Sequence, residues 1–363
     1  MAFPSGWKYY KPVTIDATPA SLGGNLSNVP QLVKITADAD LAYALATGYD
    51  IRFTTAAAPT VELNYERIAW SGGGGSAATA IFWVTVPTIL AASGASLLMY
   101  FGNAGAADGE NAAAVWTVVN YEAVWHLDDN GNQLDSTGNG YTLLAPGNAP
   151  DFQQAGQNNL CCYFDRPNSE YLEIDSAPVT TAPFTVSALF NPVTLYYYEE
   201  LFTLCDKDVN NDYWRVTVSG PRPGKPIEMH AYDGIYHYAG TSSSFSASTW
   251  QHAAGVESAS NNRSVYLDGS NKGTNTGEST PDNVDRVSIG RLGNTLNINY
   301  FLGYIEEFRI SSDAKSDDWI KYEALSQLTA GNYVTFGAMQ SLGGPFPHYT
   351  RRQMRGGMIG MGM

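Results

Sequence analysis

Short runs in which apolar and polar residues alternate recur along most of the chain, and turn-forming residues separate them. A period of two residues predicts β-strands. In the first hundred residues these runs lie at 9–15, 31–35, 51–53, 61–70, 80–86 and 96–101. Further runs lie at 123–127, 161–164, 171–174, 184–190, 200–204, 213–218, 227–232, 236–240, 250–257, 263–267, 286–289 and 303–310. The second set, about a dozen strands, predicts a large sandwich of two sheets.

One segment favours a helix. Ser316 is a good N-cap residue, and Asp317 and Asp318 would lie in the first turn, where acidic side chains are favourable. We therefore predict a short C-terminal helix over 319–326.

The uncharged stretch 77–101 is long enough to raise the question of a membrane span. Pro87 and Gly94 interrupt it, and residues 81–86 are β-branched and aromatic. We interpret the stretch as two buried strands around a turn, and we predict no membrane span.

The length of 363 residues favours two domains with separate cores. We predict an all-β protein with a small β-sandwich at 1–118 and a larger sandwich at 119–338. The segment 339–363 is rich in Met, Gly and Arg and has no hydrophobic periodicity. This segment cannot build a core, so it is either a disordered tail or, if it is ordered, a segment that lies on a neighbouring surface.

The charge distribution argues against nucleic-acid binding. The formal net charge is −15, and the acidic residues are concentrated in the second domain. The one basic region is the C-terminal segment, with Arg351, Arg352 and Arg355 and no acidic residue. A negatively charged body repels phosphate backbones. The first residues show no basic region followed by an apolar one, so we expect no secretory signal peptide.

The chain has three cysteines, Cys161, Cys162 and Cys205. A Cys162–Cys205 disulfide is one possibility, and buried free thiols are the interpretation that we favour.

The first domain resembles a known family. The matching segments are WKYYKPVTI at 7–15, YDIRF at 49–53, FWVTVP at 82–87, MYFGN at 99–103 and AVW at 114–116. They resemble a small β-domain of bacterial and phage proteins that is catalogued only as a domain of unknown function. The resemblance implies that a laminin-G-like sandwich follows.

The second domain resembles the laminin-G type of the concanavalin A-like lectin and glucanase sandwich. The matching segments are AVWHLD at 123–128, DSTGNG at 135–140, WQHAA at 250–254, VYLDG at 265–269, GYIEEFRI at 303–310 and WIK at 319–321. This resemblance implies a concanavalin A-like jelly-roll sandwich. Since the fold carries lectins, hydrolases and passive spacers, it does not decide the function.

The hydrolase branch of this fold uses the strand motif Glu-x-Asp-x-x-Glu, and retaining hydrolysis needs two carboxylates about 5–5.5 Å apart. The nearest match is Glu173-Ile174-Asp175, but Ala177 and Pro178 stand where the third acid is expected. The two acids are also compatible with the outward face of an ordinary strand. Neither a zinc-protease motif nor a serine nucleophile elbow is present, and we interpret His126 and His252 as core histidines. We predict that the protein is not an enzyme.

A structural Ca²⁺ site is a second hypothesis, which the resemblance implies. Asp135, Asn139 and Glu306 match positions that supply oxygen ligands in laminin-G-like domains. Asp135 and Asn139 are equally compatible with Asx turns. Both interpretations stay open from the sequence.

Tyrosines gather in two segments and give candidates for a glycan-binding surface. Sugars present apolar CH faces and hydroxyl edges, so their sites combine exposed aromatic rings with polar groups. The candidates are Tyr197, Tyr198, Tyr232, Asp233, Tyr236 and Tyr238. The alternative is ordinary packing of tyrosines on strands.

We therefore expect a non-enzymatic surface protein of a bacteriophage particle, such as a decoration, fibre or adhesion subunit. The lectin-like sandwich would bind host glycans, and the segment 339–363 would dock to other virion proteins. We also expect a homo-oligomer. The alternatives are an exported polysaccharide-binding protein at a bacterial cell surface and, third, a glycoside hydrolase.

Overall fold

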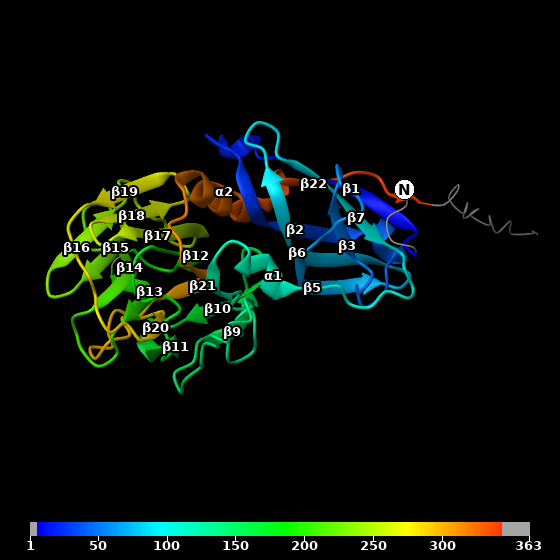
Figure 1. Cartoon of the computed structure of the whole chain (residues 1–363). Helices are drawn as coiled ribbons and strands as arrows, with labels where there is room; N and C mark the ends of the chain where they lie inside the picture. Colours follow the sequence, from blue (N-terminus) through cyan, green and yellow to red (C-terminus); the bar gives the residue numbers. More distant parts are fainter. Residues whose placement is uncertain (1–5, 196, 343–363) are drawn as a thin grey trace, which may run out of the picture.

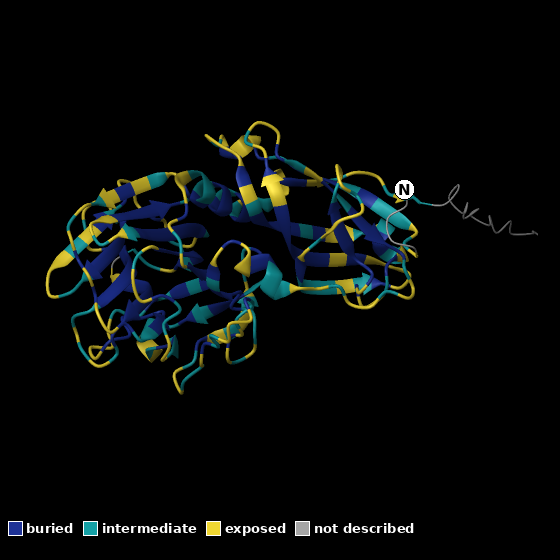
Figure 2. Ribbon diagram, viewed as in Figure 1, coloured by how far each residue is buried: buried dark blue, intermediate teal, exposed yellow. Residues whose placement is uncertain are grey.

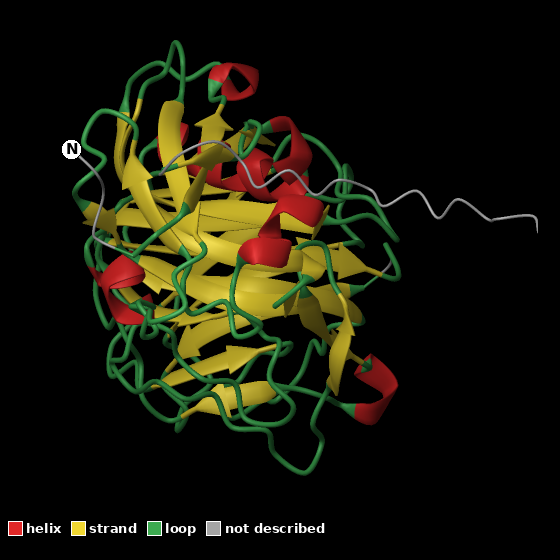
Figure 3. Cartoon of the chain, turned by 90° about the vertical axis from the view of Figure 1, so that its right-hand side faces the viewer, coloured by secondary structure: helices red, strands yellow, loops and turns green. Residues whose placement is uncertain are grey.

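The computed structural model describes residues 6–195 and 197–342. They form two β-rich domains that lie side by side, with short helices between and around them (Figure 1). Strands make up most of the regular structure (Figure 3). Buried residues follow the strands in both domains, and exposed residues concentrate at loops (Figure 2). The all-β prediction is confirmed.

The first domain is a sandwich of two antiparallel sheets. Its strands are β1 (Tyr9–Ile15), β2 (Leu26–Asp38), β3 (Arg52–Thr55), β4 (Glu62–Leu63), β5 (Tyr65–Gly73), β6 (Ser76–Ile89), β7 (Ala95–Phe101), β22 (Val334–Phe336) and β23 (Gln340–Ser341). One sheet has the order β22-β1-β7-β3-β4, with β23 also paired to β1, and the other has the order β2-β6-β5. Residues such as Val13, Phe53 and Phe82 fill the space between them.

The end of the described chain therefore returns to the first domain. Val334 pairs with Ile15, and Gln340 pairs with Tyr10. The break between β22 and β23 falls opposite Pro12, which has no N–H to donate to a ladder. The predicted boundary at 338 places β22 in the second domain, whereas its hydrogen bonds lie in the first. Residues 343–363, to which the docking prediction mostly applies, lie outside the described residues.

The second domain is a larger sandwich. One sheet contains β8 (Tyr121–Trp125), β9 (Asp151–Ala155), β10 (Leu160–Phe164), β12 (Phe184–Pro192), β17 (Gln251–Ala259), β18 (Asn262–Leu267), β19 (Asn271–Asn275) and β21 (Gly303–Ser311). The other contains β11 (Leu172–Ile174), β13 (Tyr198–Cys205), β14 (Tyr213–Ser219), β15 (Ile227–Tyr232), β16 (Tyr236–Gly240) and β20 (Arg286–Ile289). The order in this second sheet is β11-β20-β13-β14-β15-β16. Trp125, Phe190, Val216 and Phe308 belong to the core that the two sheets enclose.

The described residues contain two α-helices, α1 (Ala112–Thr117) and α2 (Asp317–Leu328), and four 3₁₀ turns at Thr18–Ala20, Ala39–Tyr43, Arg166–Asn168 and Ala330–Asn332. The predicted N-cap of α2 is confirmed, because Trp319 N donates to Ser316 Oγ at 3.2 Å. The sequence analysis missed α1. It is only six residues long, and Asn111 caps it by accepting from Ala114 N at 3.3 Å.

Helix α2 packs against both domains. Tyr322 belongs to the core of the first domain and donates to Gln31 Oε1. On its other side, Ile320 packs against Ala254 and Val256 of β17.

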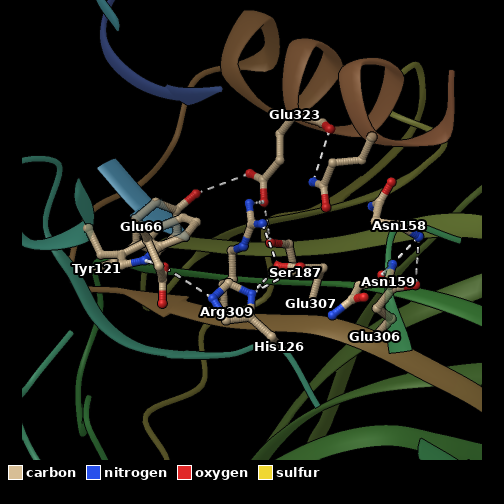
Figure 4. Close-up of polar contacts among 12 residues, drawn as sticks. Glu66, Tyr121, His126, Asn158, Asn159, Ser187, Glu306, Glu307, Arg309 and Glu323 are labelled. Carbon is tan, nitrogen blue, oxygen red and sulfur yellow. Dashed lines mark hydrogen bonds and ion pairs between the residues drawn. The ribbon is translucent and has the colours of Figure 1, made fainter. Parts of the chain in front are cut away.

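A buried group of charged residues lies at the same junction, and we call it the interdomain ion cluster: Glu66, His126, Glu307, Arg309 and Glu323 (Figure 4). A β-bulge in β21 makes this arrangement possible, since the pairing with β12 shifts between Ser187 and Leu189 and Glu307 has φ +58°. Glu307 Oε2 then accepts from Arg309 Nη2 at 2.7 Å and lies 2.9 Å from His126 Nδ1. Arg309 Nη1 also donates to Glu323 Oε1 at 3.1 Å.

All three cysteines are free and buried, as we favoured from the sequence. Among the described residues, no helix combines the length and the apolar character that a membrane span requires.

Candidate functional site

The β13-β14-β15-β16 side of the smaller sheet of the second domain presents polar and aromatic residues on the face away from the core. Alternate residues of β14, such as Trp214 and Val216, point into the core. Because side chains alternate along a strand, Arg215 and Thr217 lie on the opposite face. The register aligns Arg215 with His230 of β15, and His230 with Tyr238 of β16. This face is therefore a continuous row of side chains that can form hydrogen bonds.

A loop formed by residues 290–301 folds over one end of this face. Gly290 N donates to Leu201 O at 3.0 Å, and Glu200 N donates to Asn299 O at 2.9 Å. A bridge between Leu292 and Ile298 closes the loop on itself. The loop thus adds an apolar wall to the polar face of the sheet.

The sheet face and this loop enclose a pocket of about 360 Å³, which we call the tyrosine pocket. Its volume falls in the range of about 300–1,000 Å³ that is common for small-molecule sites. The pocket is lined by Tyr198, Arg215, Arg222, His230, Tyr236, Tyr238, Leu292, Leu296, Ile298 and Asn299.

Tyr236 and Tyr238 are held in place while their rings stay accessible. Tyr236 is 55% exposed, its ring stacks on Tyr232 at a centroid distance of 4.1 Å, and its hydroxyl accepts from Tyr213 Oη at 2.9 Å. The ring of Tyr238 stacks on His230 at 5.4 Å, and its hydroxyl accepts from Arg222 Nη1 at 3.0 Å. Fixed aromatic faces lose little side-chain entropy when a ligand packs on them.

Two buried carboxylates neutralise the cations beneath the pocket. Glu200 accepts from Arg215 Nη1 at 2.6 Å and from Asn299 Nδ2 at 2.9 Å. Glu228 Oε1 lies 2.8 Å from Arg222 Nε. The two arginines and two glutamates balance in charge, so the pocket has no net attraction for an ionic ligand.

His230 has a free acceptor in this setting. Burial lowers the pKa of His230, although Glu228 opposes the shift, so the imidazole is neutral at pH 7. Its Nε2 lies 3.0 Å from Glu228 Oε2, which assigns the proton to Nε2. Nδ1 is buried and has no hydrogen-bond partner. It can accept a hydrogen bond from a hydroxyl group in the pocket.

The structure brings together some of the tyrosines expected from the sequence. Tyr198, Tyr236 and Tyr238 line the tyrosine pocket, and Tyr232 supports it from behind Tyr236. Asp233 lies outside, where its Oδ2 accepts from Thr280 N at 2.8 Å. Tyr197 also lies outside, with the Arg166 guanidinium 3.8 Å from its ring centre.

The sequence analysis missed the polar floor and the loop wall. The only sequence indication of the polar floor is a set of polar positions that alternate with core residues in β14 and β15 or lie in the turn between them. These positions are Arg215, Arg222 and His230. The sequence does not indicate the loop wall, because the role of Leu292, Leu296 and Ile298 depends on contacts with strands distant in the sequence.

The three candidate calcium ligands take their hydrogen bonds from the protein itself. Asp135 Oδ1 accepts from Val124 N at 3.1 Å and from Thr137 N at 3.0 Å, which makes an Asx turn. Asn139 Nδ2 donates to Glu122 O at 2.9 Å. Glu306 accepts from the backbone of a different loop, including Asn158 N at 2.9 Å and Asn159 N at 3.0 Å. Within the described ranges no group of three or more His, Cys, Asp or Glu residues is arranged to hold a metal.

The carboxylates of the hydrolase-like motif are paired with arginines. Glu173 Oε2 accepts from Arg291 Nη2 at 2.6 Å, and Asp175 Oδ1 accepts from Arg286 Nε at 2.7 Å. The hydrogen bond from Arg286 lowers the pKa of Asp175, whereas a general acid needs a raised pKa.

Comparison with known families places the tyrosine pocket in a recognised fold. Residues 166–321 match the profile of the concanavalin A-like lectin/glucanases superfamily. The second domain is a concanavalin A-like sandwich. Residues 47–139 match the profile of a domain of unknown function, DUF2341. Both resemblances expected from the sequence are confirmed, and the tyrosine pocket lies on the smaller sheet of the concanavalin A-like sandwich.

Solved structures give distant matches to this chain. Domain 4 of an extracellular arabinanase from Geobacillus stearothermophilus, in complex with arabinotriose, aligns with a TM-score of 0.47 and 20% identity over 56% of this chain and 98% of that one. The carbohydrate-binding module of the Ruminococcus gnavus IT-sialidase, bound to α2,3-sialyllactose, aligns with a TM-score of 0.36 and 13% identity over 40% of this chain and 84% of that one. The comparison with curated proteins gave no match.

Proposed function

We propose that the protein binds a glycan in the tyrosine pocket. The observation that carries this proposal is the meeting of exposed tyrosine rings with hydrogen-bonding groups in one pocket. The CH face of a sugar ring packs on Tyr236 or Tyr238. Its hydroxyls reach Arg222, Asn299 and His230 Nδ1.

The charge balance favours an uncharged glycan. Glu200 and Glu228 offset Arg215 and Arg222, and His230 is neutral at pH 7. Binding would therefore depend weakly on salt, unlike the binding of a polyanion.

We further propose that binding occurs without catalysis. The arginine pairs of Glu173 and Asp175 support this, since both carboxylates are committed to ion pairs. Hydrolysis of a bound polysaccharide that Glu173→Gln abolishes would contradict it.

A glycan array tests the binding proposal, with one set of wells containing Ca²⁺ and another a chelator. Binding to a discrete group of neutral glycans supports the proposal, and uniform signal across the array contradicts it. Loss of binding in the chelator would show that glycan binding requires Ca²⁺. Asp135, Asn139 and Glu306 would then be the candidate ligands of the ion.

We propose that the protein is located at the surface of a bacteriophage particle. This part of the proposal rests on the sequence resemblance alone. Mass spectrometry of purified particles of the source tests it: absence of the protein would contradict it. A gene neighbourhood of polysaccharide enzymes would favour the alternative of a bacterial cell-surface protein.

A further inference from the structure

A second pocket, of about 390 Å³, lies where the two domains meet, and we call it the junction pocket. It is lined by Lys34 and Thr36 of β2, Gln157 and Asn158 of the loop before β10, Gln327 of α2, and residues 328–332. It shares no lining residue with the tyrosine pocket.

The loop that carries Asn158 is fixed from below by Glu306. The Glu306 carboxylate accepts from the backbone N–H of Asn158 at 2.9 Å and of Asn159 at 3.0 Å (Figure 4). It also accepts from the backbone N–H of Gln157 at 2.6 Å. Gly156 approaches so closely that a Cβ there would stand 2.5 Å from Glu306 Oε2. The backbone that carries the Asn158 side chain is thus fixed before any ligand arrives.

Contacts from the other segments close the sides of the junction pocket. Lys34 Nζ donates to Gln157 O at 3.2 Å, and Gln157 Nε2 donates to Leu328 O at 2.8 Å. Lys34 comes from the first domain, Gln157 from the second and Leu328 from the helix that both domains share. The pocket exists only when the two domains are docked.

Two buried amides that line the junction pocket have atoms without a hydrogen-bond partner among the described residues. Asn158 is 4% exposed, and neither its Oδ1 nor its Nδ2 forms a hydrogen bond. Gln327 is 2% exposed, and its Oε1 is also unpaired while its Nε2 donates to Glu323 O at 3.1 Å. Buried polar groups are nearly always paired, so three such atoms on two residues that line this pocket indicate that something polar occupies it. Asn158 Nδ2 is an unpaired donor group, and Asn158 Oδ1 and Gln327 Oε1 are unpaired acceptors. Hydroxyl groups match this combination, because each hydroxyl both donates and accepts.

Among the residues that the structure describes, Lys34 is the one charged side chain that lines the junction pocket. Burial lowers its pKa, and Glu306 only partly offsets this. Glu306 itself is turned toward the backbone of the 157–159 loop. An anionic group next to Lys34 would compensate its partial desolvation.

We propose that the junction pocket binds a small hydroxylated carboxylate of the size of a sugar acid. The carboxylate pairs with Lys34, and the hydroxyls pair with the amides of Asn158 and Gln327. This site is separate from the tyrosine pocket and does not depend on the proposed glycan binding.

Isothermal titration calorimetry of the full chain tests the proposal with D-glucuronate and, as a neutral probe with the same ring, D-glucose. We expect saturable binding of glucuronate and at least about tenfold weaker binding of glucose, because glucose lacks the partner for Lys34. Absence of saturable glucuronate binding would mean that the pocket holds water only, and would overturn the proposal.

Two variants with matched controls locate the binding. Asn158→Leu replaces the unpaired amide by an apolar side chain with the same branching and number of heavy atoms, so it should weaken glucuronate binding at least about tenfold without lowering the melting temperature. Lys34→Gln should remove the preference for glucuronate over glucose. The controls are Asn261→Leu, in an exposed turn, and Lys272→Gln, in a surface ion pair with Asp317. Unchanged binding by Asn158→Leu, or equal losses in the controls, would contradict the assignment.

Discussion

Glu66 Oε2 of the first domain lies 3.2 Å from His126 Nε2 of the second, inside a region closed to solvent. The other ring nitrogen of His126 lies 2.9 Å from Glu307 Oε2. Burial by itself would lower the pKa of His126, but Glu307 and Glu66 raise it well above its ordinary value. The imidazolium therefore acts as a fixed cation that joins the domains.

We predict that His126→Gln lowers the free energy of unfolding by about 3–5 kcal/mol at pH 7, because Glu66 is left buried without its cation and Glu307 keeps only Arg309. The folded protein keeps a proton on His126 that the unfolded chain releases above about pH 6.5. This contribution is complete below that pH and is lost as the pH rises toward the folded-state pKa.

Urea unfolding between about pH 6.5 and 9 measures this effect. The wild type should lose stability with rising pH more steeply than His126→Gln, since the variant has no such proton to lose. Equal slopes in the two proteins would contradict the assignment.

Arg309 is the second cation of the interdomain ion cluster. It is 2% exposed, and its guanidinium lies 4.3 Å from the Trp83 ring centre and 4.7 Å from that of Trp116. We predict that Arg309→Met destabilises the protein by about 3–5 kcal/mol, because Glu323 is left buried without its cation and Glu307 keeps only His126.

A surface ion pair provides the control for Arg309. Lys272 Nζ lies 2.8 Å from Asp317 Oδ1 in an exposed setting, and such pairs contribute about 0.2–1 kcal/mol. Thermal and urea unfolding should show a larger loss of unfolding free energy for Arg309→Met than for Lys272→Met. Similar losses in the two variants would contradict a stabilising role for burial of the cluster.

The return of the chain to the first domain gives a third prediction. Ending the chain at Thr329 removes β22 and β23 and leaves β1 with one neighbour, β7. Hydrogen–deuterium exchange at the β1 amides that face β22 should accelerate strongly, while exchange in β14 of the second domain stays unchanged. Equal protection of β1 in both proteins would contradict the pairing.

Local sequence patterns predicted much of this structure. Alternation in Tyr213–Ser219 and Ile227–Tyr232 predicted β14 and β15, and Ser316 with two following aspartates predicted α2. These elements form where neighbouring residues decide the backbone conformation and the buried face.

Contacts between distant residues could not be predicted in this way. The wall of the tyrosine pocket depends on Gly290 meeting Leu201, and the junction pocket depends on Lys34 meeting Gln157. Glu306 matched a calcium-ligand position, yet its bulged strand turns it to the backbone of the 157–159 loop. A sequence motif gives the residue type but not the partner that the fold supplies.

The cysteines give a simple test of the core. Burial raises the pKa of Cys161 and of Cys205 to about 12, so neither forms the reactive thiolate near neutral pH. We predict that a thiol reagent such as Ellman's reagent detects no thiol in the folded protein and all three in denaturant. Detection of a single thiol in denaturant would indicate a disulfide and contradict the assignment of three free cysteines.

Tyr236 forms part of the proposed glycan-binding pocket, and Tyr197 provides a matched control. Both side chains are about half exposed, at 55% and 52%, but only Tyr236 lines the tyrosine pocket. The most direct measurement is the affinity of Tyr236→Ala and Tyr197→Ala for the glycan that binds best to the wild type on the array. We predict that Tyr236→Ala weakens binding at least about tenfold and that Tyr197→Ala leaves it within about twofold. Equal affinities of the two variants would contradict the account.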